Sequence, residues 1–166
     1  MKSKDKLKHL PNRTDSMCFG CSPVNPTGLR LEFYTDGDAI FSWLKVPDHL
    51  CGWKNLAHGG VISTILDEVM GRTVIHKMRC LGMTKSITVE FLKPVTINAE
   101  LKATGKVTDV KNGRECLTEG MLFNERGELC AKARGTFVLF QPERSKKMGI
   151  KDEDAMEWFN AFMKEQ

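Results

Sequence analysis

The 166-residue sequence lacks any uninterrupted apolar run close to the roughly 18 residues that suggest a membrane-spanning helix. Its Lys-rich first ten residues are not followed by the apolar segment and small-residue cleavage site of a secretory signal. Internal repeats and low-complexity stretches are missing too. We therefore expect a cytoplasmic protein without a membrane partner, built as one domain because 18.7 kDa is an ordinary single-domain size.

A strongly basic face is also missing. The net charge is only +4, and much of it comes from residues 2–8 and 144–147 near the two ends, which we interpret as solvated tails. Duplex nucleic acid requires a basic face with base-reading residues, and the sequence has none, so we expect no nucleic-acid partner.

The six cysteines are dispersed along the chain, and several fall where buried strand residues are expected, which favours free thiols. The segment Cys18-Phe19-Gly20-Cys21 has the spacing of half a zinc site, but no second Cys-x-x-Cys or His pair completes four ligands. We therefore expect no metal and no cofactor, and interpret this segment as an N-terminal turn that packs small thiols.

Residues 1–17 show little hydrophobic periodicity and are expected to form a loosely held arm. Alternating residues on both sides of the turn at 36–38 predict a hairpin over 29–46, and residues 51–58 are interpreted as a loop. Apolar residues then recur at helical spacing, which predicts a helix from about 59 to 75. It is the only long helix expected within the domain, which we assign to residues 18–142.

Strands are predicted over 86–92, 100–110, 115–123 and 128–140, with Asn112-Gly113 as a type I′ turn. Hairpin-length links between these strands indicate an antiparallel sheet with one helix buried against it, an α+β domain. Residues 143–166 are expected to form a C-terminal helical extension, whose apolar stripe predicts docking on the body or on a neighbour. The stripe contains Met156, Phe159 and Phe162.

The predicted helix 59–75 has two unlike faces. One half of its circumference is apolar and is expected to face the sheet. The other half carries small residues and one carboxylate, where a solvent-exposed face would be expected to carry Lys, Glu and Arg. These residues are Gly60, Ser63, Thr64, Asp67 and Gly71. Asp is a poor residue for a helix interior, so we favour a catalytic or ligand-facing carboxylate over a solvated one.

His58-Gly59-Gly60 marks the start of this helix, where free backbone N–H groups and the helix dipole favour developing negative charge. These groups could form an oxyanion site, with Asp67 two turns further along the same helix as base or nucleophile. His58 could equally order the loop by hydrogen bonding.

The triplet at 58–60, with Asp67 nine positions after the histidine and Gly71 closing the stripe, resembles the helix motif of the hotdog-fold thioesterase superfamily. It is most similar to the PaaI-like and 4-hydroxybenzoyl-CoA thioesterase branch. The opening segment from Cys18 and the strand from Thr84 to Phe91 resemble the same family, so the resemblance covers about residues 18–140. It implies a hotdog fold, an antiparallel sheet wrapped around one long helix, assembled as dimers or tetramers with active sites at the dimer interface.

The resemblance implies an acyl-CoA thioesterase that releases a free acid and CoA. Asp67 would activate water or attack the thioester carbonyl, and the Gly59 N–H would polarise that carbonyl. His58 would support the loop, and Thr84, from the partner chain, would help to position water. Three further residues are expected to bind substrate: Gly60, Asn55 and Lys93. Many relatives have an amide side chain at the position of Gly52, and Asn55 is the candidate to replace it here.

Two other functions stay open at the level of sequence. The same fold could serve as a non-catalytic acyl-CoA-binding protein, since fold does not fix function. An acyl dehydratase of related fold would need a His and an acid that converge on the acyl chain. A further ambiguity is that Glu68 directly follows Asp67; the helical wheel puts Glu68 near the edge of the apolar face and favours Asp67.

Overall fold

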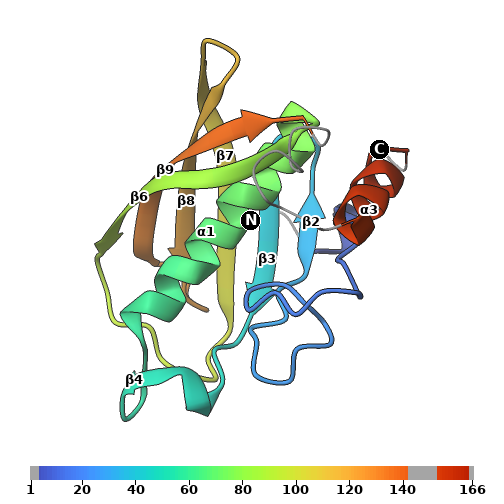
Figure 1. Cartoon of the computed structure of the whole chain (residues 1–166). Helices are drawn as coiled ribbons and strands as arrows, with labels where there is room; N and C mark the ends of the chain where they lie inside the picture. The colour runs from blue at the N-terminus through green and yellow to red at the C-terminus, as the bar shows by residue number, and fades with distance from the viewer. Residues whose placement is uncertain (1–3, 142–152, 165–166) are drawn as a thin grey trace.

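The computed structural model describes residues 4–141 and 153–164, in which a seven-stranded antiparallel sheet curves around the long helix α1 (Gly59–Met78). Figure 1 shows α1 lying across one face of the sheet, with the C-terminal helix beside β2. This confirms the α+β architecture predicted from the sequence. In spatial order the strands are β1 (Lys8–Leu10), β2 (Phe33–Thr35), β3 (Ile40–Leu44), β7 (Leu101–Lys111), β8 (Glu115–Phe123), β9 (Leu129–Phe140) and β6 (Leu81–Phe91).

Helix α1 forms because its apolar residues recur at the helical period and meet the sheet, mainly strands β6, β7, β8 and β9. All six predicted core residues are buried, whereas the small-residue face is partly exposed. The helix ends at Arg79, which adopts a left-handed conformation (φ 51°) and donates its N–H to the Ile75 carbonyl at 3.1 Å. The six buried residues are Val61, Ile62, Ile65, Leu66, Val69 and Met70.

The helix packs against β7 at the distance that a glycine allows. A Cβ atom added to Gly105 would lie 2.5 Å from both the Val69 carbonyl oxygen and Thr73 Oγ1. Since one of these atoms belongs to the helix backbone, any side chain at position 105 must push α1 away from the sheet. Gly105 therefore sets how closely the apolar face of α1 packs against the sheet.

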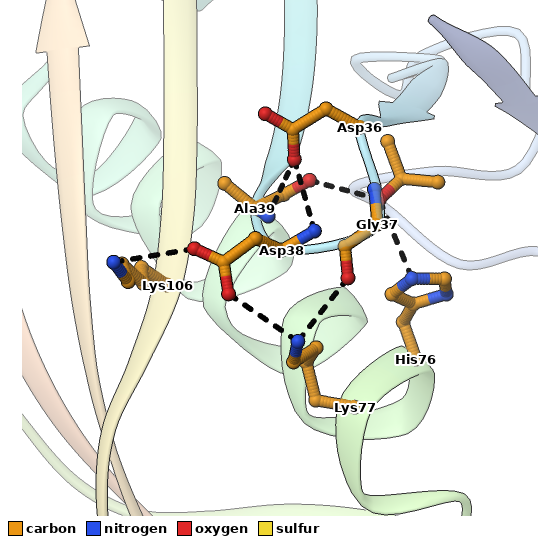
Figure 2. A network of polar contacts seen from close by, with 8 residues as sticks. Asp36, Gly37, Asp38, Ala39, His76, Lys77 and Lys106 are labelled. Atoms are coloured by element: carbon orange, nitrogen blue, oxygen red, sulfur yellow. Dashed lines mark hydrogen bonds and ion pairs between the residues drawn. The ribbon is translucent and has the colours of Figure 1, made fainter.

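A polar network joins the β2–β3 turn to the end of α1, as Figure 2 shows. Asp36 Oδ1 accepts from the backbone N–H groups of Asp38 and Ala39, both at 2.9 Å. Lys77 Nζ donates to the Gly37 carbonyl at 3.1 Å and lies 3.3 Å from Asp38 Oδ1. This network ties the predicted hairpin to the C-terminal turn of the helix.

Two regions differ from the sequence prediction. The N-terminal segment is not a loose arm throughout, because β1 pairs with β2 and Leu10 is fully buried. Residues 51–58 are not a simple loop: β4 (Cys51–Trp53) and β5 (Leu56–Ala57) pair as a small second sheet. Conversely, residues 29–32 of the predicted hairpin lie outside its strands. The boundaries of the arm, domain and extension stay predictions.

The C-terminal helix α3 (Glu153–Lys164) is observed where the sequence predicted it. It docks on the body: Phe159 and Phe162 are buried, and Arg79 Nη2 donates to the Met163 carbonyl at 2.9 Å. The predicted Asn112-Gly113 turn is also confirmed, since both residues have the positive φ values (51° and 61°) of a type I′ turn. Within the described residues, neither helix is long and apolar enough to cross a membrane.

Candidate functional site

The N-terminus of α1 is capped by His58, whose Nδ1 accepts the Gly60 N–H at 2.9 Å. This hydrogen bond holds the loop before α1 to the helix, so His58 orders the loop, as the sequence analysis allowed. The same bond occupies the Gly60 N–H, which is then not free for a ligand. Val61 and Ile62 both donate their N–H groups to the His58 carbonyl. The Gly59 N–H, by contrast, has no acceptor among the described residues. Gly59 is therefore the residue of this turn with an N–H available to a ligand.

Asp67 lies in the middle of α1 and faces β6. Its Oδ1 accepts a hydrogen bond from Thr84 Oγ1 at 2.8 Å, and its Oδ2 accepts none from any described residue. Burial raises the pKa of Asp67 above its ordinary value, with a further raising effect of negative charge on Cys18, while the Thr84 hydrogen bond opposes the shift. The structure thus brings two of the predicted catalytic residues together, and both come from one chain. The sequence prediction placed Thr84 on the partner chain, whereas in this structure Thr84 contacts Asp67 of its own chain.

Gly59 and Asp67 do not converge within one chain. They are separated by eight positions on one helix, which at 1.5 Å per residue places their backbones about 12 Å apart. A reacting carbonyl must lie within about 3–3.5 Å of the attacking atom, so it cannot touch the Gly59 N–H and Asp67 of the same helix at once. The two residues can therefore act on one carbonyl only if they come from different chains. Each half of the predicted site is intact, but the halves lie at separate points along α1.

A cavity of about 460 Å³ opens beside Asp67 and Thr84. The N-terminal segment and α1 supply most of its polar and charged side chains, whereas Leu81 on β6, Phe137 on β9 and Trp158 on α3 supply an apolar wall. A volume of this size falls in the usual range for small-molecule pockets. The Asp67 carboxylate consequently faces a cavity with an apolar wall, large enough for part of a small-molecule ligand.

A second group of titratable residues lines the same cavity and was missed at the level of sequence. Cys18 Sγ lies 3.5 Å from both Cys21 Sγ and Glu68 Oε1. Hydrogen bonding from Cys21 lowers the pKa of Cys18 to about 5, whereas burial and the adjacent Cys18 charge raise the pKa of Glu68 to about 7. The pKa of Cys21 is raised by its contact with Cys18 and by burial. No spacing rule could reveal Glu68 as a neighbour, because it is 50 positions from Cys18.

Arg72, one turn beyond Glu68, is buried beside this group. Its Nη2 donates to Asn12 Oδ1 at 2.8 Å, and its guanidinium lies 4.6 Å from the Phe33 ring centroid, 5.1 Å from that of Trp158 and 5.7 Å from that of Phe162. Burial lowers the pKa of Arg72, and negative charge on Cys21 and Glu68 opposes this effect. Arginine stays protonated in proteins, so the site contains a permanent buried cation.

Two predicted substrate-binding residues lie away from Asp67. The Asn55 side chain is exposed and its carbonyl accepts the Ile97 N–H at 3.1 Å. Lys93 follows β6, and its Nζ pairs with Glu128 Oε1 at 2.5 Å. The preceding strand residue Phe91 contacts the Gly59 position, so Lys93 belongs to the end of the fold where α1 begins.

Comparison with known families and proteins gives this geometry a context. The model of the thioesterase superfamily matches residues 54–131, a segment that contains both Asp67 and Thr84. An uncharacterized protein of Schizosaccharomyces pombe is 38% identical over 94 residues, which are 54% of this chain and 53% of that protein. The chain therefore spans about half the length of this curated relative.

Solved structures share the fold. A thioesterase superfamily protein superposes with a TM-score of 0.67 at 24% identity, over 74% of this chain and 60% of that one. A hypothetical thioesterase of Streptococcus pneumoniae with coenzyme A gives 0.62 at 21% identity, over 67% and 86%. The E. coli PaaI protein of the phenylacetic acid degradation operon gives 0.61 at 17% identity, over 68% and 80%. At these identities the structures establish the fold, and the PaaI-like branch stays a prediction. The described structure thus has the hotdog fold of these solved proteins, and its central segment, residues 54–131, matches the model of the thioesterase superfamily.

Proposed function

We propose that this chain hydrolyses an acyl-CoA thioester to a free acid and CoA, with Asp67 as the reacting carboxylate. The observation that carries the proposal is the Asp67–Thr84 pair at the wall of an apolar cavity. The hydroxyl of Thr84 fixes one carboxylate oxygen and leaves Oδ2 for chemistry. A binding pocket for an acyl chain gains nothing from a half-buried carboxylate, because burial of such a group costs free energy unless it is used.

The missing oxyanion donor would come from a second copy of the chain. One helix cannot supply both the Gly59 N–H and Asp67 to the same carbonyl, since they are about 12 Å apart. Two antiparallel copies related by a two-fold axis would place Gly59 of each near Asp67 of the other, and would create two equivalent sites. This arrangement agrees with the dimer-interface active site that the resemblance implies.

Strand β6 is the surface that would join the copies. It is the last strand of the described sheet, pairs with β9 on one side, and leaves the other side of its 11 residues without a partner among the described residues. Exposed apolar side chains accompany this edge: Met83 is 44% exposed, Phe91 55% and Leu92 48%. A long unprotected edge favours pairing with another strand, and β6 also carries Thr84. Dimer formation would then bring the two halves of each site together.

The chemistry follows from these positions. The thioester carbonyl would lie against the Gly59 N–H at the positive end of α1, which stabilises the oxyanion that forms on attack. Asp67 would either take a proton from the attacking water or attack the carbonyl carbon itself. Collapse of the tetrahedral intermediate would release CoA as a thiolate. The acyl chain would occupy the cavity between Leu81, Phe137 and Trp158.

The comparisons support this proposal. A solved relative with the same fold contains coenzyme A, and the same Streptococcus pneumoniae protein also occurs as two alanine variants, one replacing an aspartate and one a threonine. Aspartate and threonine are the residue types paired at Asp67 and Thr84. For CoA itself, Lys93 and the exposed Asn55 at the α1 entrance are the candidates of this chain for its phosphates and amides.

The test is replacement of Asp67 by Asn, which keeps the shape and removes the charge. We expect kcat to fall by about 10²- to 10⁴-fold, the usual contribution of a general base, while fold and oligomer survive. CoA release from a panel of acyl-CoAs is followed with a thiol reagent. Asp109→Asn is the matched control, because Asp109 is an exposed residue of β7 outside the cavity. Near wild-type rates for Asp67→Asn would disprove the assigned role.

The same assay separates the other two functions. Acyl-CoA binding without CoA release by the wild-type protein would support a non-catalytic binding protein. A dehydratase would need His58 and Asp67 to converge, but nine positions of helix separate them and His58 Nδ1 is engaged by Gly60. Formation of an enoyl product without CoA release would nevertheless overturn the hydrolase proposal.

A further inference from the structure

The cluster of Cys18, Cys21 and Glu68 has the donor set and the spacing of a metal site. One ligand atom from each residue lies within 4.8 Å of the other two. Among the described residues, these three side chains form a group that could hold a metal ion. The cluster lines the cavity beside Asp67, yet the hydrolysis proposed above uses none of its side chains. Thiolate and carboxylate donors together are typical ligands of Zn²⁺.

Two of the three separations are close to the edges of a zinc tetrahedron, and the third, between Cys21 and Glu68, lies within 4.8 Å. With Zn–S bonds of about 2.3 Å and Zn–O bonds of about 2.0–2.2 Å, tetrahedral ligands lie about 3.8 Å apart for two sulfurs and about 3.5 Å apart for sulfur and oxygen. The Cys18–Cys21 sulfurs are 3.5 Å apart, and Cys18 Sγ is 3.5 Å from Glu68 Oε1. A disulfide would require about 2.05 Å between the sulfurs and would leave Glu68 without a role.

The local backbone holds this arrangement. The turn that carries both cysteines is closed by the Ser22 N–H, which donates to the Cys18 carbonyl at 3.2 Å. A Cβ at Gly20 would lie 2.3 Å from the Glu68 side chain. Glycine at position 20 therefore lets the turn sit directly over the carboxylate.

The charges also balance around a dication. Two thiolates and one carboxylate carry three negative charges, and the buried Arg72 beside Cys21 and Glu68 carries one positive charge. The remaining two negative charges equal the charge of Zn²⁺. Half-buried charges this close together are costly unless they are paired or coordinate a metal.

We propose that Cys18, Cys21 and Glu68 bind one Zn²⁺ ion, with a fourth coordination position that opens into the cavity beside Asp67. Three protein ligands with one open position is the pattern of a zinc site that can accept water or a ligand oxygen. The ion would also fasten the N-terminal turn to α1. Sequence spacing could not reveal this site, because Glu68 takes the place of the second ligand pair that a zinc motif normally shows.

The experiment measures metal binding without any acyl-CoA, so its outcome is independent of the proposed hydrolysis. The full chain is purified under reducing conditions without chelator, and its metal content is determined by mass spectrometry. We expect one zinc per chain. After removal of zinc, titration with Co²⁺ should saturate at one equivalent with thiolate-to-cobalt charge-transfer bands and the intense visible bands of tetrahedral cobalt.

Three variants assign the ligands. Cys18→Ser and Cys21→Ser should each lose the stoichiometric zinc and most of the charge-transfer intensity, and Glu68→Gln should weaken binding with its thiolate bands retained at high Co²⁺. Cys51→Ser is the matched control, because Cys51 is an exposed cysteine away from the cavity, and it should bind as wild type. Circular dichroism checks that each variant folds.

Several outcomes overturn the proposal. Wild-type protein that binds neither zinc nor cobalt stoichiometrically would disprove it whatever the variants do. So would a Cys18–Cys21 disulfide found by peptide mapping of the non-reduced protein in place of bound metal. Unchanged affinity in Glu68→Gln would remove the carboxylate from the site, and zinc retained by both serine variants would place the metal elsewhere.

Discussion

Replacing Gly59 by proline removes a single N–H group from the proposed oxyanion donor and leaves the helix in place. Gly59 is the first residue of α1, where proline is well tolerated because its fixed φ suits the helix. The preceding residue, His58, already has the extended conformation (φ −64°, ψ 138°) that a residue before proline prefers. A Cβ at position 59 meets only the Phe91 ring, at 3.5 Å, which is ordinary contact.

The expected effect is on catalysis alone. Loss of one oxyanion donor costs about 10²–10³ in kcat, or about 2.7–4 kcal/mol of transition-state stabilisation. Unfolding free energy should stay the same or rise by about 0.4–1 kcal/mol, because proline restricts the unfolded chain. Gly59→Ala is the matched control: it adds a comparable side chain, keeps the N–H, and should retain most of the activity.

A mixing assay then tests whether the site is shared. Chains carrying Gly59→Pro and chains carrying Asp67→Asn are each nearly inactive, but a mixed dimer would have one site with both an intact Gly59 and an intact Asp67. After the two variants are unfolded together and refolded, random pairing makes half of the dimers mixed, and half of their sites are complete. The mixture should therefore recover about a quarter of wild-type activity.

Three results would refute this reasoning. A Gly59→Pro protein with normal kcat would show that this N–H does not bind the oxyanion. A mixture no more active than its parts would show that the two halves are not contributed by different chains. Sedimentation equilibrium that finds only monomer at micromolar concentration would exclude a shared site altogether.

Two further predictions concern stability and CoA binding. Gly105→Ala should lower the free energy of unfolding by about 1–3 kcal/mol through overpacking against the α1 backbone. Gly71→Ala, whose new methyl would meet only Phe137 at 3.5 Å, should raise the free energy of unfolding by about 0.5–1 kcal/mol through helix propensity. Urea unfolding measures both values, and a Gly105→Ala protein as stable as wild type would contradict the packing argument. Lys93→Ala should raise KM about fivefold with little change in kcat, equivalent to about 1 kcal/mol for an exposed charge contact. Glu128→Gln, which frees Lys93 from its ion pair, should lower KM instead, and an unchanged KM in both variants would remove Lys93 from the CoA site.

Sequence reasoning predicted the parts of the fold whose signal is local. The helix predicted at about 59–75 and the four strands predicted between 86 and 140 follow from residue periodicity and from turn residues such as Asn112-Gly113. The structure confirms these elements, with α1 extended to Met78 and β6 beginning at Leu81. It missed β1, because three residues are too short to show alternation and their pairing with β2 depends on contacts across the chain. It also treated 51–58 as a loop, since two strands of three and two residues leave no periodic pattern.

The site was predicted in part for the same reason. Asp67 and its small-residue neighbours share a helix face that a wheel reveals, and Thr84 was placed by resemblance. The axial distance between Gly59 and Asp67 was overlooked, although the helical rise alone determines it. Glu68 was considered only as a competitor of Asp67, because its neighbours Cys18 and Cys21 meet it through the turn at 18–22, which no sequence pattern connects to α1.

Trp158, which forms part of the cavity wall, lies outside the segment of the chain that matches the superfamily model. Residues 54–131, which the superfamily shares, contain Asp67 and Thr84, whereas Trp158 and the cysteine turn lie outside that segment and are held to it through Arg72. Under the proposed function, the reacting pair lies within this segment while Phe137 and Trp158 of the cavity wall lie outside it, so the two can change independently during evolution. A relative that matches only the central segment shares the region of the proposed reacting pair but not Trp158, so under this proposal its substrate must be established with its own terminal segments in place.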